Sequence, residues 1–181
     1  MKKIEWFWNI IYYQVYKFDL KCRELFNYLN PFYFINKIAA IKRYHAKHGV
    51  NDMNGFANRI LNNPKSGISS IWSGSFMGGL IVLVEYGIFN IVQGITNLQL
   101  IQNIWKGSFN FTIYLILLLL PTVLINTSFL FRKDKYLNYF KEFELMSKKE
   151  KTKYGWVSFF VIMFVFSFFI GSFLILKTHK L

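Results

Sequence analysis

The residue with the clearest chemical potential is Glu85, an acid within a long apolar stretch. The stretch, residues 68–92, reads ISSIWSGSFMGGLIVLVEYGIFNIV and carries no other charge. A charged side chain at membrane depth costs about 2.5–3.5 kcal/mol on insertion scales, so such residues usually have a specific role. Two roles are open for Glu85: a carboxylate that binds a proton or cation in a polar cavity, or a protonated acid that hydrogen-bonds a neighbouring helix.

Arg43 and His48 form a second candidate set, with the spacing Arg-x4-His in a basic segment. This spacing resembles the motif of the HEPN ribonuclease family, in which an Arg and a His act on the RNA phosphodiester. The resemblance covers six residues and implies a membrane-anchored nuclease with Arg43 and His48 as its catalytic pair. Tyr44 stands where the family often has a polar residue. The alternative reading of the segment is a basic helix end beside a membrane.

Other reactive groups are sparse in this sequence. His45 and His48 have a spacing that could bind a metal, but no third ligand is evident, and Cys22 is the single cysteine. No Ser-His-Asp set, phosphate-binding glycine loop or haem motif is visible. The sequence therefore predicts no metal and no cofactor, and it favours a non-enzymatic role.

Three stretches are long and apolar enough to cross a bilayer. A membrane core about 30 Å thick needs about 20 residues at about 1.5 Å rise each. Residues 68–92, 110–131 and 155–176 meet this length, and no basic residue lies within any of them. Pro121 lies near the middle of the second stretch, where it removes a backbone donor and predicts a kink. The predicted fold class is all-α, a polytopic membrane protein with three transmembrane helices.

Small residues recur on one face of the first span. Ser70, Gly74 and Gly78 are spaced by four, and such a face lets two helices approach closely in lipid. Ser167 and Gly171 offer a similar contact on the third span. The expected partner of these faces is another span of the same chain, a second copy of the chain, or a different membrane protein.

Residues 1–67 are predicted to form a basic, amphipathic helical layer in or on the cytoplasmic membrane interface. Its first helix has an apolar stripe at helical spacing, made by Ile4, Phe7, Trp8, Ile11, Val15 and Phe18. A second helix is expected to begin at Asn30-Pro31 and stop at Gly49, and Asp52 is expected to cap a third. The tryptophans expected at membrane–water interfaces are Trp6, Trp8, Trp72, Trp105 and Trp156.

The remaining segments are a linker at 93–109, a basic loop at 132–154 and a short tail at 177–181. The loop is predicted to be a helical hairpin with an apolar stripe made by Tyr136, Phe140 and Phe143. A capping box at Ser147 to Glu150 is predicted to start the last helix.

The positive charge of the chain is concentrated in two regions. Residues 1–67 hold 11 Lys and Arg against four acids, and residues 132–154 hold eight against four, whereas the 93–109 linker holds one Lys. Cytoplasmic loops carry excess Lys and Arg, so we expect a cell-membrane protein with a cytoplasmic N-terminus and an external C-terminus. Anionic lipid headgroups are the expected partner of this charge, in preference to nucleic acid.

The leading functional hypothesis is a small integral-membrane interaction or accessory protein that assembles through helix packing. The alternative is a channel, pore or transport-associated subunit that uses Glu85. The third hypothesis is the membrane-anchored nuclease that uses Arg43 and His48.

Overall fold

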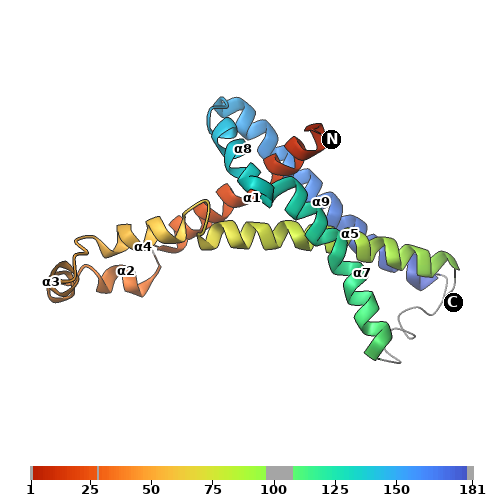
Figure 1. Cartoon of the computed structure of the whole chain (residues 1–181), viewed down its shortest axis with the longest axis horizontal. Coiled ribbons are helices and arrows are strands. Elements are labelled where there is room, and N and C mark those ends of the chain that lie inside the picture. The colour runs from red at the N-terminus through yellow and green to blue at the C-terminus, as the bar shows by residue number, and fades with distance from the viewer. Residues whose placement is uncertain (1, 28, 97–107, 179–181) are drawn as a thin grey trace. The chain divides into compact units, whose positions relative to one another are not determined.

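The computed structural model describes residues 2–27, 29–96 and 108–178 (Figure 1). Every regular element in these ranges is a helix, so the prediction of an all-helical chain is confirmed for the described residues. In chain order the elements are α1 (Lys2–Asn27), α2 (Pro31–Ile35), α3 (Ala39–Lys47), α4 (Met53–Leu61), α5 (Ile68–Thr96), α7 (Ser108–Asn126), η1 (Thr127–Phe131), η2 (Arg132–Asp134), α8 (Lys135–Glu144) and α9 (Lys148–Thr178).

The chain forms two compact units. One unit, here called the long-helix unit, comprises Met1–Ile11 and Ser75–Leu181. The other, here called the N-terminal unit, comprises Tyr12–Gly74. Helices α1 and α5 contribute residues to both units.

Three helical stretches among the described residues are long and apolar enough to cross a membrane, as predicted. The first, α5, ends at Thr96, beyond the expected end at residue 92. The second, α7, is continuous through Pro121 to Asn126, and the π-helical η1 carries the chain on to Phe131. The third, α9, starts at Lys148.

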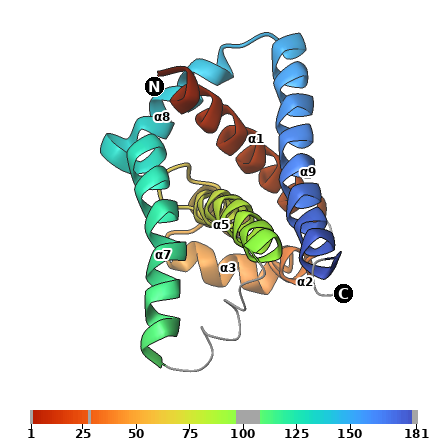
Figure 2. The ribbon, with the colours of Figure 1, turned by 90° about the vertical axis from the view of Figure 1, so that its right-hand side faces the viewer.

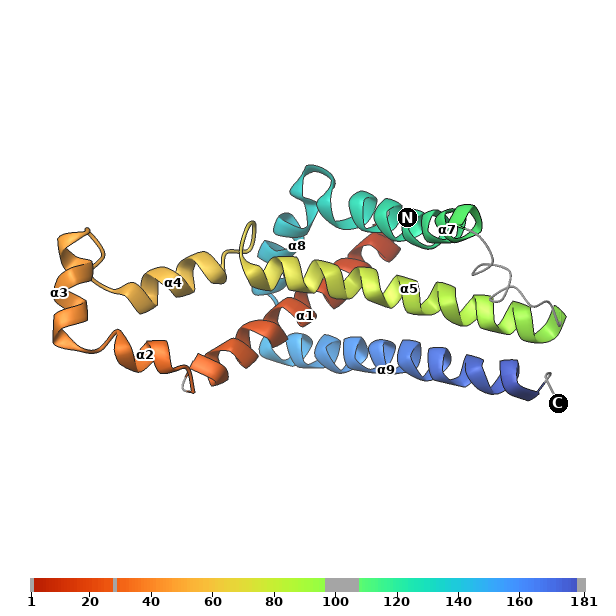
Figure 3. The ribbon, with the colours of Figure 1, turned by 90° about the horizontal axis from the view of Figure 1, so that it is seen from below.

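Contacts within the long-helix unit define the directions of its three long helices (Figures 2 and 3). Gly87 of α5 lies against Phe168 of α9, and Gly94 lies against Ile175, so α5 and α9 run in the same direction. Gly78 of α5 lies against Thr122 and Asn126 of α7, nearer the C-terminal end of that helix. Phe89 contacts Tyr114, nearer its beginning, so α7 runs antiparallel to α5.

A sharp turn joins η1 to α8. Lys133 and Asp134 both adopt positive φ angles, 58° and 52°, in the left-handed region that non-glycine residues rarely enter. After the turn, α8 buries its predicted apolar stripe, made by Tyr136, Phe140 and Phe143.

The start of α9 is fixed by the predicted capping box. The Ser147 backbone N–H donates to Glu150 Oε2 at 2.9 Å, and the Glu150 N–H donates to Ser147 Oγ at 3.3 Å. Two backbone donors that have no partner within the helix are thereby satisfied. The capping box predicted from the sequence is therefore confirmed.

The N-terminal unit is held together by tyrosines of α1. The Tyr12 hydroxyl donates to the Ser70 carbonyl at 3.1 Å, and the Tyr16 hydroxyl donates to the Asn62 carbonyl at 2.7 Å. The predicted apolar stripe of α1 is divided: Ile11 and Val15 are buried, whereas Ile4 and Phe18 are exposed.

The prediction of one helix from Pro31 to Gly49 was wrong, because the chain turns after Ile35 and forms α2 and α3. At the turn, the Asn36 side chain donates to Asn54 Oδ1 of α4 at 2.8 Å, a tertiary contact that local propensity does not reveal. The predicted stop is correct: Gly49 has a φ of 80°, and its N–H donates to the Ala46 carbonyl at 3.0 Å. The Val50 N–H donates to the His45 carbonyl, which completes a Schellman motif.

Candidate polar site between the long helices

The long-helix unit buries polar side chains on helices that are otherwise apolar. Asn90 of α5 is fully buried, and its Nδ2 donates to Ser172 Oγ of α9 at 3.1 Å. The Ser172 hydroxyl in turn donates to the Phe169 carbonyl at 2.6 Å. Asn90 Oδ1 has no hydrogen-bond partner among the described residues. The hydrogen bond between α5 and α9 therefore leaves the carbonyl oxygen of the Asn90 side chain, a strong acceptor, unsatisfied in the described chain.

Glu85 is half-buried on α5, and its Oε2 is also buried without a hydrogen-bond partner in the described chain. Thr122 Oγ1 of α7 is likewise buried and has no hydrogen-bond partner among the described residues. An unsatisfied buried acceptor costs about 1–3 kcal/mol. Protonation of Glu85 would remove the cost of its buried charge, and a water molecule or a bound cation would supply a partner for an unsatisfied oxygen.

The first-span face of Ser70, Gly74 and Gly78 is buried within this chain. A Cβ added to Gly78 would lie 3.2 Å from Thr122 Cγ2 and 3.4 Å from Asn126 Nδ2, so α5 and α7 pack closely there. Ser70 Oγ lies 2.9 Å from the Tyr12 hydroxyl of α1 within the N-terminal unit. A contact of this face with a second copy remains a prediction.

The contact between α5 and α9 uses glycines that sequence reasoning missed. A Cβ added to Gly94 would lie 3.1 Å from the Ile175 carbonyl oxygen, and one added to Gly87 would lie 2.6 Å from Phe168 Cε1. The seven-residue spacing of Gly87 and Gly94, with polar Asn90 between them, is the signal that could have identified this face. We call these residues, together with Phe168, Ser172 and Ile175, the α5–α9 contact.

Ser167 and Gly171, the small residues predicted for packing on the third span, lie elsewhere. The Ser167 side chain is exposed, and a Cβ added to Gly171 would meet nothing within 4 Å. They form no close packing contact within the described chain, and a role in binding another membrane protein remains a prediction.

Two of the tryptophans predicted for the interface, Trp6 and Trp8, donate side-chain hydrogen bonds to distant residues. Trp6 Nε1 donates to Glu142 Oε1 at 3.0 Å, and Trp8 Nε1 donates to Asn126 Oδ1 at 3.2 Å. Trp72 and Trp156 are exposed. Trp105 lies outside the described residues.

An ion pair that the sequence did not suggest attaches the start of α1 to α8. Lys135 Nζ donates to Glu5 Oε2 at 2.8 Å, and the Tyr139 hydroxyl donates to Glu5 Oε1 at 3.1 Å. The hydrogen bond from Lys135 is the main cause that lowers the pKa of Glu5; partial burial opposes it, and Tyr139 adds to it. The partners are 130 residues or more apart in the chain, so no local pattern marks them.

Arg43 and His48 do not converge on one cavity. Both are exposed at α3, and five residues along an α-helix turn the chain by about 140° beyond one full turn. The Tyr44 ring packs against His48, with ring centroids 4.7 Å apart. Among the described residues no group of three His, Cys, Asp or Glu could hold a metal ion. The nuclease hypothesis gains no support from this geometry.

Comparisons with protein-family models, with curated proteins and with solved structures find no match to this chain.

Proposed function

We propose that this chain is a small integral-membrane interaction protein whose three long helices cross the bilayer. One observation carries the proposal: the long helices bury several polar side chains and expose many large apolar side chains. Asn90, Ser158 and Ser172 are buried, whereas Leu117 and Phe164 are 64% and 70% exposed. A soluble protein with this pattern would expose a large apolar surface to water, which monomeric soluble proteins rarely do.

The same pattern supports a role in interaction with other proteins. In lipid, helices associate through close packing of small residues and through interhelical hydrogen bonds, because lipid tails are as apolar as leucine. Such contacts are made inside the chain by Gly78, Gly87, Gly94 and Asn90. The outward faces of α7 and α9 then meet lipid or another membrane protein. The Lys and Arg residues of 1–67 and 132–154 favour a cytoplasmic location for both segments.

A labelling experiment tests insertion and orientation together. Cys22 is the single cysteine, so a Cys22→Ser chain provides a background for Thr96→Cys and Lys141→Cys. We expect a membrane-impermeant maleimide to label Thr96→Cys in intact cells, and Lys141→Cys only after permeabilisation. The chain should also stay in the pellet after alkaline carbonate treatment. Release by carbonate would contradict insertion, and the reverse labelling pattern would contradict the orientation.

The interaction role is tested by the mass of the purified complex. Light scattering in a mild detergent should report a protein mass above the 21.6 kDa of one chain, from a second copy or a co-purified membrane protein. A single chain in every mild detergent, with no crosslinked species in native membranes, would contradict the role.

A second candidate function, ion or proton transport, is favoured by Glu85 Oε2, which is buried on α5 and has no hydrogen-bond partner in the described ranges. A buried carboxylate oxygen without a hydrogen-bond partner among the described residues can take up a proton or bind a cation. Reconstituted liposomes should then show ion or proton flux that Glu85→Gln abolishes and Glu144→Gln leaves intact, because Glu144 is exposed at the end of α8. The absence of flux from the parent protein under every tested gradient would reject this candidate as an autonomous activity.

A further inference from the structure

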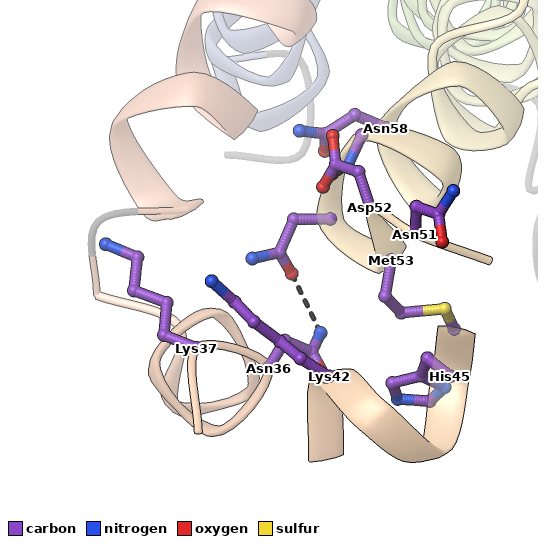
Figure 4. Close-up of a pocket in the computed structure, with 10 residues that line it drawn as sticks. Asn36, Lys37, Lys42, His45, Asn51, Asp52, Met53 and Asn58 are labelled. Atoms are coloured by element: carbon purple, nitrogen blue, oxygen red, sulfur yellow. Dashed lines mark hydrogen bonds between the residues drawn. The ribbon is translucent and has the colours of Figure 1, made fainter. Parts of the chain in front are cut away.

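The N-terminal unit contains a polar pocket between the α2–α3 turn, α3 and α4 (Figure 4). Its volume is about 370 Å³. The lining side chains with a positive charge or N–H donors are Lys37, Lys42, His45 and the four asparagines Asn36, Asn51, Asn54 and Asn58. Figure 4 shows Lys37 and Lys42 extending to the same side of the pocket, with the His45 ring at the other end beside Met53. The pocket therefore presents several hydrogen-bond donors to one volume.

The charge balance of the pocket favours an anion. Lys42 has no ion-pair partner in the described part of the chain. Lys37 Nζ lies 5.9 Å from the centroid of the Phe34 ring, a cation–π contact. Asp52 is the one acid of the lining.

Asp52 caps a helix, and its single negative charge offsets only one of the two lysines. Its Oδ1 accepts from the Gly55 N–H at 3.0 Å, as the N-cap of α4. A Cβ at Gly55 would collide with the Asp52 carboxylate, which shows how closely the cap lies over the first turn. The Asn36–Asn54 hydrogen bond joins the α2–α3 turn to the same helix. The pocket walls are thus fixed by contacts that do not need a ligand.

Apolar side chains next to the pocket point to a lipid rather than a soluble anion. Phe34 and Ile38 come three residues before and one residue after Lys37, and they are 56% and 53% exposed. Phe56, next to Gly55 on α4, is exposed as well. Exposed aromatic and aliphatic groups beside lysines are typical of surfaces that enter the boundary between headgroups and acyl chains.

We propose that this pocket binds the phosphate of an anionic lipid headgroup, with Lys37, Lys42 and His45 as donors and Phe34, Ile38 and Phe56 against the acyl chains. This inference rests on the proposed membrane location. Lipid binding in detergent tests the pocket, whereas carbonate extraction tests membrane insertion, so the two can fail independently. Two lysines against one acid match the single negative charge of a phosphodiester. A lipid headgroup and a soluble phosphate ester both carry a phosphate group, so the test uses three ligands that distinguish these two sources.

The test uses the full chain in detergent and native mass spectrometry. The ligands are dioctanoyl phosphatidylglycerol, glycerol 3-phosphate, which lacks the chains, and dioctanoylglycerol, which lacks the phosphate. We expect one phosphatidylglycerol to bind with higher affinity than either fragment. Lys37→Gln with Lys42→Gln should weaken that binding about tenfold, because two charge-assisted hydrogen bonds are lost at a partly exposed site. Lys42→Arg, which keeps the charge, should bind like the parent.

The matched control is Arg43→Gln with Lys47→Gln, which removes the same charge from α3 outside the pocket lining. Equal phosphatidylglycerol affinity for the parent and the Lys37/Lys42 variant would overturn the proposal, as would equal weakening in the control. Glycerol 3-phosphate that binds as tightly as the lipid would assign the pocket to a soluble phosphate instead. Displacement of the lipid by a single-stranded RNA oligonucleotide at lower concentration would assign it to nucleic acid.

Discussion

The α5–α9 contact predicts that two alanine substitutions on α5 differ in their effect on stability: one should destabilise the chain and the other should not. A Cβ added to Gly87 would lie 2.6 Å from Phe168 Cε1 and 3.0 Å from Cδ1. Because two carbon atoms rest about 3.5–4.0 Å apart, the ring or α9 must move by about 1 Å. At Gly79, an added Cβ would meet nothing within 4 Å. Gly87→Ala therefore tests packing, and Gly79→Ala is its matched control.

The expected magnitude follows from two opposing effects. Overpacking costs about 1–3 kcal/mol, and alanine recovers up to about 1 kcal/mol through its better helix propensity. Gly87→Ala should therefore lower the free energy of unfolding by about 1–2 kcal/mol. Gly79→Ala experiences only the propensity term, so it should be neutral or stabilising.

Thermal unfolding of the detergent-purified chain, followed by tryptophan fluorescence, measures this difference. A change of 1–2 kcal/mol corresponds to a Tm lowered by about 2–8 °C for a chain of this length. Near neutral pH in one detergent, Gly87→Ala should melt below the parent and Gly79→Ala at or above it. Variants that melt within about 1 °C of each other would refute the α5–α9 contact, because the predicted packing cost would be missing.

Three further predictions concern the remaining contacts. Glu5→Gln should lower the free energy of unfolding by about 1 kcal/mol at neutral pH. The value is small because Lys135 is partly exposed and water screens the ion pair. Because the folded pKa of Glu5 is lowered, its contribution is complete above the unfolded pKa of about 4.3 and is lost as pH falls through the folded pKa. The Tm difference between the parent and Glu5→Gln should therefore shrink as the pH falls from neutral through the lowered pKa of Glu5. Gly67→Ala should lower the Tm, because its Cβ would lie 2.6 Å from the Asn63 backbone nitrogen. Asp52→Ala should speed amide hydrogen exchange in α4, since loss of an N-cap costs about 0.5–2 kcal/mol.

Each of these predictions has its own contrary result. A pH-independent Tm difference for Glu5→Gln would show that the charge of Glu5 does not stabilise the fold. A parent-like Tm for Gly67→Ala would show that the backbone there moves without cost. Unchanged exchange in residues 53–61 of Asp52→Ala would show that the cap is dispensable.

Features encoded over a few residues could be predicted from the sequence. Ser147 and Glu150 define a capping box through spacing alone, and Asp52 and Gly49 mark helix ends through their backbone preferences. The apolar stripe of Tyr136, Phe140 and Phe143 is a periodic signal and is buried as expected. The three long apolar helices follow from length and composition.

Features that depend on distant partners could not be predicted. Glu5 looks like an ordinary surface acid until Lys135 is placed beside it. The helix expected from Pro31 to Gly49 is divided because Asn36 bonds Asn54, and neither residue alone marks a break. Among the glycines of the long helices, Gly94 contacts α9 whereas Gly79 meets open space, and the seven-residue spacing of Gly87 and Gly94 marks a face without identifying the helix it contacts. That difference depends on helix rotation, and rotation is set by all three helices together.

The partnership of Asn90 with Ser172 also has a consequence for the order in which the chain is made. The two residues are 82 positions apart, with α7 and α8 between them. At about 5–20 residues per second, Ser172 is synthesised about 4–16 s after Asn90. During that interval the Asn90 amide on the newly made α5 lacks the hydroxyl that it binds in the finished chain. A protein that shields α5 during synthesis, or delayed release of α5 into lipid, would therefore raise the yield of the folded form.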